Sequence, residues 1–395
     1  MVVELQHEMK PSLQPEELAR QRFVSGIRAF ILGDLANDLR QAYTEEVEPT
    51  FSRQHGRKPE TSNEVHAAMR GNMAFNVYSS MRVKAQKMVW ASTEGIVHRE
   101  LDRLNEEAAK VESQPGSFTL NPDMVIPRNV DAIDVHLMPG SYTRGGTSLE
   151  GGAVYDQGLA VFSMGLMGAN LDDIGSSMAA YIANKFPEFQ PSRILDTGCS
   201  IGHNTLPWKK TYPQAHVEAI DVAPGGLVYG SARAKMQSQE VHFRQMSADS
   251  LDYEDESFDL VFSSMFLHEI SKKARANAFK EAHRVLKPGG LLLHMELPPN
   301  DEMAPFDGFF LDWDSWYNEE PFYKGYRDER PADLCRDAGF EEADFLQFTV
   351  PPVGLYGEEA VKQAIANESD GSVDSESTGR LTDGMTWFGF GSWKR

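Results

Sequence analysis

The N-terminal part of the chain carries apolar residues at the spacing of an α-helix. In residues 14–48 they stand at i, i+4, i+7, i+8 and i+12, which predicts one apolar helix face: Phe23, Ile27, Phe30, Ile31 and Leu35. Residues 63–112 continue the pattern with Met69, Met73, Val77 and Met81. Ser62 or Asn63 is suited to cap this second helical region. We therefore expect residues 1–113 to form an all-α domain. Its Met-rich stripe is expected to be core, with a ligand or dimer groove as the alternative.

The pattern changes at residue 114. Residues 114–155 are rich in Pro, Gly, Ser and Thr, which predicts an irregular connector with one short strand at 132–137. Residues 156–186 are again helical in character.

From residue 193 short apolar runs alternate with helical segments. Strands are expected at 193–197, 217–221, 241–246, 258–263 and 290–297, and helices at 205–212, 224–237 and 272–286. Such alternation predicts a parallel sheet with right-handed crossovers. An aromatic segment at 298–330, a helix at 331–338 and two strands at 345–350 and 385–392 complete the chain. The acidic, Ser-rich stretch 357–380 between those two strands is expected to be a helix followed by a mobile loop.

Composition narrows the function classes. The chain has 395 residues, enough for two or three domains. Its net charge of −21 argues against a nucleic-acid partner. No window approaches the length of a membrane span, and the N-terminus lacks the pattern of a secretory signal. With only two cysteines, Cys199 and Cys335, we expect reduced thiols and a cytoplasmic location.

The loop after the first strand of the sheet discriminates between ligands. It reads Asp196-Thr-Gly198-Cys-Ser200-Ile-Gly202, so its small residues follow G-x-S-x-G and not the G-x-G-x-x-G of dinucleotide folds. An acid at the strand end would repel a pyrophosphate and suits a ligand with a positive centre, such as S-adenosylmethionine. Asp221, at the end of the next strand, is suited to accept hydrogen bonds from ribose hydroxyls. A dehydrogenase is therefore disfavoured.

Four motifs in order carry a family resemblance: ILDTGCSIG, VEAIDV, SADSLDYEDESFDLVFSSMFLHEI and RVLKPGGLLLHMEL. Residues 193–297 resemble the core of the class I S-adenosylmethionine-dependent methyltransferases, in particular small-molecule enzymes related to ubiquinone and menaquinone methyltransferases. The resemblance implies an α/β fold for residues 156–395: a Rossmann-like, doubly wound, seven-stranded sheet with an antiparallel C-terminal strand pair. It does not extend to residues 1–150. Ser200 departs from the usual glycine, and a positive φ there would cost free energy.

The resemblance and the spacing assign candidate site residues. S-adenosylmethionine contacts are expected from twelve residues: Asp196, Gly198, Cys199, Ser200, Gly202, Asp221, Val222, Ala248, Asp249, Ser264, Met265 and, from the connector, Tyr155. Asp249 is expected at the adenine. His136 is expected in the same connector, over the cofactor. Cys199 is expected to act only as a small residue.

Catalytic and acceptor residues are less constrained. His268 and Glu269 are the catalytic candidates, with His268 as a general base, a substrate-pocket residue or a structural residue. Acceptor contacts are assigned to five residues: Glu296, Phe309, Trp313, Trp316 and Tyr317. The alternative for the aromatic segment is packing against the N-terminal helices or a second subunit. No metal-ligand spacing is evident, so no metal is expected.

These features predict a methyltransferase acting on a small organic molecule, with the N-terminal helices closing the acceptor site and forming a homodimer. The acceptor atom could be oxygen, nitrogen, sulfur or carbon. A protein or RNA methyltransferase is the second hypothesis, disfavoured by the acidity and by the absence of an Asn/Asp-Pro-Pro-Tyr run. A non-catalytic cofactor-binding module is the third.

Overall fold

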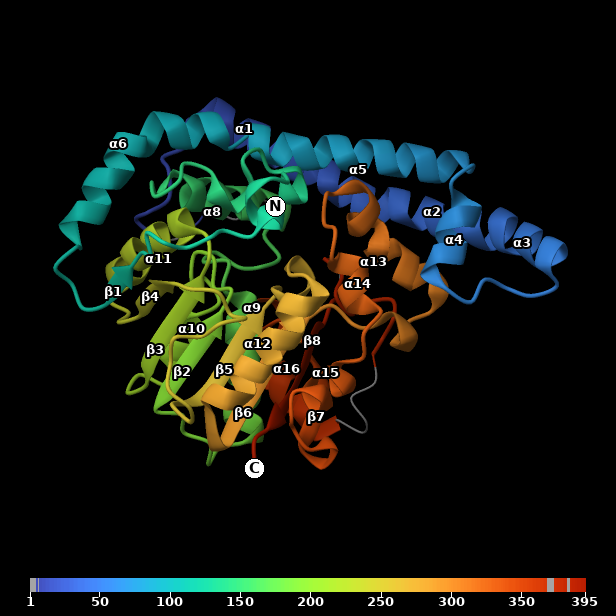
Figure 1. The fold of residues 1–395 in the computed structure, drawn as a ribbon. Coiled ribbons are helices and arrows are strands. Elements are labelled where there is room, and N and C mark those ends of the chain that lie inside the picture. The colour runs from blue at the N-terminus through green and yellow to red at the C-terminus, as the bar shows by residue number, and fades with distance from the viewer. Residues whose placement is uncertain (1–4, 6, 368–372, 382–383) are drawn as a thin grey trace.

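The computed structural model describes residues 5, 7–367, 373–381 and 384–395. The first helical region is confirmed as one nearly continuous helix interrupted by two π-helical turns: α1 (Pro15–Phe30), η1 (Ile31–Leu35), α2 (Ala36–Ala42), η2 (Tyr43–Val47) and α3 (Glu48–His55). Three further helices follow: α4 (Ser62–Met69), α5 (Met73–Ala91) and α6 (Glu94–Lys110). Figure 1 shows these helices lying across one end of the sheet.

The predicted apolar stripes are confirmed in part: Ile31 and Met69 are buried in a hydrophobic cluster, and Ile27, Leu35 and Met81 pack against it. Phe23 and Phe30 are 59% and 45% exposed, and Met73 and Val77 are 74% and 42% exposed. The buried face of α1 instead carries polar side chains: Gln21, Ser25 and Arg28, together with Val24. The predicted stripes therefore cover only part of the buried faces, because polar residues on these helices also face the interior and a hydrophobic pattern cannot identify them.

The connector holds no strand at 132–137; that segment contains the short 3-10 helix η3 (Val135–Leu137). His136 and Leu137 there have φ of 58° and 54°, values outside the β region. A short strand, β1 (Ser117–Thr119), forms earlier and pairs in parallel with β4. The remaining helices up to the sheet are α7 (Arg128–Asp131), η4 (Ser141–Thr143), α8 (Glu150–Phe162) and α9 (Asp173–Lys185).

The central sheet is confirmed as Rossmann-like, with eight strands instead of seven because β1 joins its edge. The strand order is β1-β4-β3-β2-β5-β6-β8-β7, with β8 antiparallel to both of its neighbours. The order reverses beside β2, so β2 and β5 flank the crevice in which such folds bind ligands. The bounds are β2 (Arg193–Thr197), β3 (His216–Asp221), β4 (His242–Gln245), β5 (Phe258–Ser264), β6 (Leu286–Glu296), β7 (Phe345–Val350) and β8 (Trp387–Trp393).

Both faces of the sheet are covered by helices. Ile194 and Leu195 are consecutive residues of β2, yet they belong to two different hydrophobic clusters, as alternation along a strand requires. The covering helices include α10 (Leu206–Thr211), α11 (Pro224–Met236), α12 (Lys272–Val285), α15 (Pro331–Asp337) and α16 (Val353–Asn367). The Ser-rich loop predicted up to residue 380 lies partly outside the described residues.

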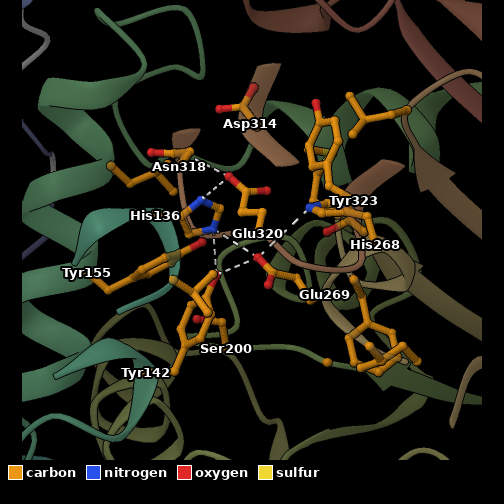
Figure 2. A pocket seen from close by; sticks show the side chains of 18 of the residues that line it. His136, Tyr142, Tyr155, Ser200, His268, Glu269, Asp314, Asn318, Glu320 and Tyr323 are labelled. Carbon is orange, nitrogen blue, oxygen red and sulfur yellow. Dashed lines mark hydrogen bonds and ion pairs between the residues drawn. The ribbon is translucent and has the colours of Figure 1, made fainter. Parts of the chain in front are cut away.

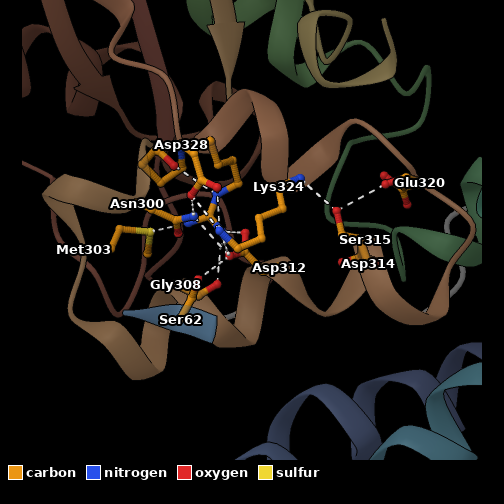
Figure 3. A network of polar contacts seen from close by, with 12 residues as sticks. Ser62, Asn300, Met303, Gly308, Asp312, Asp314, Ser315, Glu320, Lys324 and Asp328 are labelled. Carbon is orange, nitrogen blue, oxygen red and sulfur yellow. Dashed lines mark hydrogen bonds and ion pairs between the residues drawn. The ribbon is translucent and has the colours of Figure 1, made fainter. Parts of the chain in front are cut away.

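The aromatic segment 298–330 is helical and is fastened by a buried ion pair. It forms η6 (Asn300–Glu302), α13 (Pro305–Tyr317) and α14 (Tyr323–Arg327). Arg327 of α14 pairs with Asp312 of α13, and both side chains are fully buried. Ser62 of α4 donates its hydroxyl to Asp312 over 2.7 Å, and Asn300 donates its amide over 3.0 Å (Figure 3). This network joins the N-terminal helices to the segment that follows the last parallel strand.

The N-terminal helices share hydrophobic clusters with the rest of the chain. Val65 and Phe75 belong to the cluster that contains the aromatic residues of α13, and Trp90 belongs to a cluster with α8 and α11. The division at residue 113 remains a prediction, and α8 runs across the predicted boundary at 155. None of the described helices combines the length and apolar character that a membrane crossing requires.

Candidate functional site

A cavity of about 570 Å³ opens at the carboxyl ends of the central strands. Its walls come from the loops after β2, β3, β4 and β5, from the connector, from α13 and α14, and from the N-terminal helices α1 and α5. A volume of this size falls in the range of small-molecule sites. The cavity therefore lies where the strand order predicts a ligand, and the N-terminal helices close it.

The loop after β2 passes close to this cavity because of its unusual backbone. Gly198 has φ of 74°, and a Cβ there would lie 2.2 Å from the Phe266 ring. Ser200 stands where the family usually has glycine and adopts φ of 50°. This backbone conformation is strained for a residue with a side chain. Only a residue without a side chain fits at position 198.

Asp221 holds that loop in place. Its carboxylate accepts the backbone N–H of Ser200 over 2.9 Å and that of Ala223 over 2.8 Å. Burial raises its pKa, and these N–H donors oppose the rise. Asp221 still lines the cavity, and a carboxylate has lone pairs beyond those two bonds for a ligand hydroxyl.

Ten of the twelve predicted cofactor residues line the cavity: Gly198, Cys199, Ser200, Asp221, Val222, Ala248, Asp249, Ser264, Met265 and Tyr155. Asp196 and Gly202 do not. Asp196 is buried behind the loop and accepts a hydrogen bond from Thr205 over 2.5 Å. Burial, together with the nearby Asp221, raises the pKa of Asp196 to about 7. The structure therefore gives Asp196 a role in shaping the loop.

A second polar cluster, which we call the His136 cluster, consists of His136, Tyr142, Glu269 and Glu320. The two imidazole nitrogens of His136 lie 2.8 Å from Glu320 and 2.9 Å from Glu269, and Tyr142 donates to Glu269 over 3.0 Å (Figure 2). All four side chains line the cavity. Their positions in the sequence lie up to 184 residues apart, so spacing could not reveal them as a group. The sequence indicates two members separately, His136 in the connector and Glu269 as a catalytic candidate, and it gives no signal for Tyr142 or Glu320.

Charge within the His136 cluster is set by burial and by the two acids. Burial lowers the pKa of His136, but the carboxylates of Glu320 and Glu269 outweigh it and raise that pKa well above its usual value. Burial raises the pKa of Glu320. One oxygen of Glu320, Oε2, is buried and accepts no hydrogen bond from the residues that the structure describes. Glu320 therefore offers a proton acceptor beside the cavity.

The same atoms could serve as metal ligands. His136, Glu269 and Glu320 each offer one atom, and these atoms lie within 4.8 Å of one another. Both imidazole nitrogens of His136 already face a carboxylate, whereas a metal would need one of them as an unprotonated ligand. The arrangement favours a shared proton.

His268, the base candidate from sequence, is held as a cation. Its Nδ1 lies 2.7 Å from the Glu296 carboxylate, which is fully buried and also accepts the backbone N–H of Leu267. Burial lowers the pKa of His268, but Glu296 and Glu269 outweigh it and raise the pKa to about 9. An imidazole protonated at neutral pH cannot accept a proton. We therefore assign His268 a charged, positioning role, although it lines the cavity. Glu296 supports it from behind and does not line the cavity.

The four aromatic acceptor candidates lie outside the cavity lining. Trp316 stacks on His66 of α4 with ring centroids 3.7 Å apart, and Tyr317 forms a 2.9 Å hydrogen bond with the same histidine. Trp313 donates its indole N–H to Ser79 of α5 over 3.0 Å, and Phe309 packs on Phe75 with a centroid separation of 5.3 Å.

Each of these four rings contacts a residue of α4 or α5. The aromatic segment therefore packs against the N-terminal helices, which is the alternative given in the sequence analysis. Other residues of the same segment and its surroundings do reach the cavity: Phe310, Leu311, Asp314, Asn318, Glu320 and Tyr323.

Residues 194–290 match the family model described as a methyltransferase domain. Similar curated proteins include the demethylmenaquinone methyltransferase of Thermus thermophilus, 34% identical over 112 residues (28% of this chain, 50% of that protein). Another is the erythromycin 3''-O-methyltransferase of Saccharopolyspora erythraea, 29% identical over 140 residues (35% of this chain, 45% of that protein). The chain spans half or less of the length of these relatives.

Solved structures are similar only at a distance. The phosphoethanolamine N-methyltransferase 2 of Haemonchus contortus, solved with S-adenosyl-L-methionine, is 19% identical with a TM-score of 0.41. The match covers 60% of this chain and 57% of that one.

Proposed function

From the premise that residues 194–290 form a class I S-adenosylmethionine-dependent methyltransferase domain, we propose that the protein methylates a small organic molecule. The reaction is an in-line displacement at the methyl carbon, which needs alignment, exclusion of water and, for a hydroxyl or ammonium acceptor, removal of a proton. The enclosed cavity that joins the cofactor loop to the N-terminal helices supports a small acceptor.

The residues at the strand ends fit S-adenosylmethionine. Gly198 lets the loop backbone pack against the Phe266 ring, which also lines the cavity, Asp221 can accept ribose hydroxyls, and Asp249 lies where an adenine amino group could donate. When bound, the cofactor supplies an electrophilic methyl group on a positively charged sulfur. The acids around this part of the cavity suit a cation and would repel a diphosphate.

We assign the general base to Glu320, acting with His136. The free oxygen of Glu320 is buried, and its raised pKa makes it a better proton acceptor than an exposed carboxylate. His136, charged and bound to both Glu269 and Glu320, fixes the orientation of the two acids. Its backbone φ of 58° is the kind of strain that functional sites retain. This assignment replaces His268 as the base.

The observation that carries the proposal is the Asp221 carboxylate, fixed by two backbone donors and facing the cavity. Isothermal titration with S-adenosylhomocysteine tests it. We expect binding by the unmodified protein, at least about 10-fold weaker binding by Asp221→Ala, and unchanged binding by the control Asp252→Ala, whose side chain is 91% exposed. Absence of heat at millimolar ligand would refute the enzyme reading. Methyl transfer from labelled cofactor into a metabolite extract then identifies the product.

We further propose a homodimer formed through the N-terminal helices. The exposed apolar side chains Phe23 and Phe30 on α1 and Met73 and Val77 on α5 support it. Light scattering of the protein and of a Phe23→Ser, Phe30→Ser variant tests the dimer, which the double variant is expected to lose.

The two buried, unpaired cysteines support a cytoplasmic location. The net charge of −21 supports a partner other than nucleic acid.

A further inference from the structure

The wall of the cavity beyond Glu320 is cationic. Three arginines from separate parts of the chain line it: Arg28 of α1, Arg82 of α5 and Arg380 of the segment before β8. In Figure 2, Ser200 of the cofactor loop lies on one side of Glu320, and Asp314, which belongs to the part of the cavity with the arginines, lies on the other side. Asp314 pairs with Arg82 over 2.7 Å. The cationic wall is thus contributed largely by the N-terminal helices, which the methyltransferase family match does not include.

Arg28 is the exceptional member of this wall, because it is buried without an acid partner. Its side chain donates to two neutral acceptors, the Phe162 carbonyl over 3.0 Å and the Gln86 amide oxygen over 2.8 Å. The guanidinium also lies 4.1 Å from the centre of the Phe162 ring. Within the described part of the chain, no carboxylate oxygen lies within 4.0 Å of it, and its Nη2 makes no hydrogen bond. Arg28 is only 4% exposed.

The nearby carboxylates do not balance the charge of Arg28, because each of them already pairs with another arginine. Arg82 uses the Asp314 carboxylate, and Arg380 uses Asp307, which also pairs with Arg40 of α2. The three guanidinium groups of the cavity therefore face two carboxylates, one of them shared with a fourth guanidinium. The Nε atom of Arg380 is buried and lacks a hydrogen-bond partner among the described residues.

Such an arrangement carries a free-energy cost. Burying a charged group without a partner of opposite charge is unfavourable. Burial and the nearby Arg82 lower the pKa of Arg28 to about 9, against a smaller opposing effect of Asp314. At neutral pH the guanidinium remains charged and open to the cavity. An anionic group of a ligand would compensate this cost, and a planar guanidinium suits the paired oxygens of an oxyanion.

We propose that the methyl acceptor carries a compact oxyanion, a carboxylate or a phosphate monoester, that binds Arg28 at the cationic wall. The acceptor atom then lies on the Glu320 side of the cavity, next to the cofactor site. This inference rests on the proposed function and adds the class of acceptor. It also gives the N-terminal helices a role, since α1 and α5 determine which acceptors fit.

The test separates a metabolite extract on a strong anion exchanger. The retained and unretained fractions are each incubated with the 395-residue protein and methyl-labelled S-adenosylmethionine. We expect labelled product from the retained fraction only. Treating that fraction with alkaline phosphatase beforehand distinguishes the two oxyanions: loss of the product identifies a phosphate monoester, and its persistence identifies a carboxylate.

Variants at Arg28 connect the result to this side chain. Loss of a hydrogen bond to a charged group predicts that Arg28→Met lowers kcat/KM for the acceptor by about 10- to 100-fold, mainly through KM, with unchanged S-adenosylhomocysteine binding. Arg28→Lys keeps the charge and should retain part of the activity. The matched control is Arg22→Met, on the exposed side of the same helix. Binding of S-adenosylhomocysteine also verifies that each variant is folded.

Product from the unretained fraction, or an Arg28→Met variant that binds the cofactor and keeps the unmodified KM, would overturn the anionic acceptor while leaving the methyltransferase in place. Absence of product from both fractions, with S-adenosylhomocysteine still bound, would also count against it. Absence of S-adenosylhomocysteine binding would instead refute the proposed function. The fraction experiment needs no variant, so a poorly folded Arg28 variant does not prevent the decision.

Discussion

The buried pair of His268 and Glu296 predicts a specific pH dependence of stability. The pKa of His268 is raised to about 9, compared with 6.5 for an ordinary histidine. A raised pKa in the folded state means that protonation favours folding. The stabilisation is complete below pH 6.5, declines as the pH rises and is lost above about pH 9. A separation of about 2.5 pH units, at about 1.36 kcal/mol per unit, corresponds to about 3 kcal/mol.

The Glu296→Gln variant isolates this contribution. Glutamine can still accept the Leu267 N–H, but it removes the charge that keeps the buried imidazole protonated. The free energy of unfolding, measured with urea, should differ between the two proteins by about 3 kcal/mol more at pH 6 than at pH 9.5. An exposed-site control, Glu254→Gln, should differ by less than about 0.5 kcal/mol at both pH values. A difference for Glu296→Gln that is the same at pH 6 and pH 9.5 would show that His268 is neutral, and would restore it as a candidate base.

Three further predictions concern the loop, the base and the network that joins the helices. Gly198→Ala should weaken S-adenosylhomocysteine binding by at least about 10-fold in calorimetry, whereas Gly289→Ala, also at positive φ but in open space, should leave it unchanged. Equal affinities of the two variants would refute a role for the close contact between Gly198 and Phe266. Glu320→Gln should lower kcat for labelled methyl transfer by about 100-fold or more without changing cofactor affinity, and an unaltered kcat would exclude it as the base. Asp312→Asn should lower the unfolding free energy by about 3–5 kcal/mol in urea, against less than about 1 kcal/mol for the exposed Asp333→Asn; similar losses would contradict the buried network.

The parts of the fold that sequence predicts are those with strong local patterns. The β2 and β3 strands and the loop from Asp196 to Gly202 lie within one short stretch, so their geometry follows from local residues. The strand β1 was missed because it has only three residues, all of them exposed, and has no apolar alternation. The hydrophobic pattern identifies only part of the buried face of α1, because Gln21 and Arg28 are buried polar residues.

The residues of the site also fall into two groups, those that the sequence predicts and those that only tertiary packing brings together. Cofactor candidates come from strand ends whose relative positions the fold dictates, so most of them line the cavity. The His136 cluster and the arginines of the cationic wall come from segments far apart in the chain, and tertiary packing alone assembles them. The aromatic content of the segment 298–330 favours Trp313 and Trp316 as acceptor contacts, yet composition does not indicate which side of α13 faces the cavity.

The most direct test is a crystal structure of the protein with S-adenosylhomocysteine. The account predicts adenosine at the carboxyl ends of β2 and β3, with the ribose hydroxyls on Asp221, the adenine beside Asp249, and the sulfur directed toward Glu320. A nucleoside bound elsewhere, or a ribose without contact to Asp221, would contradict it.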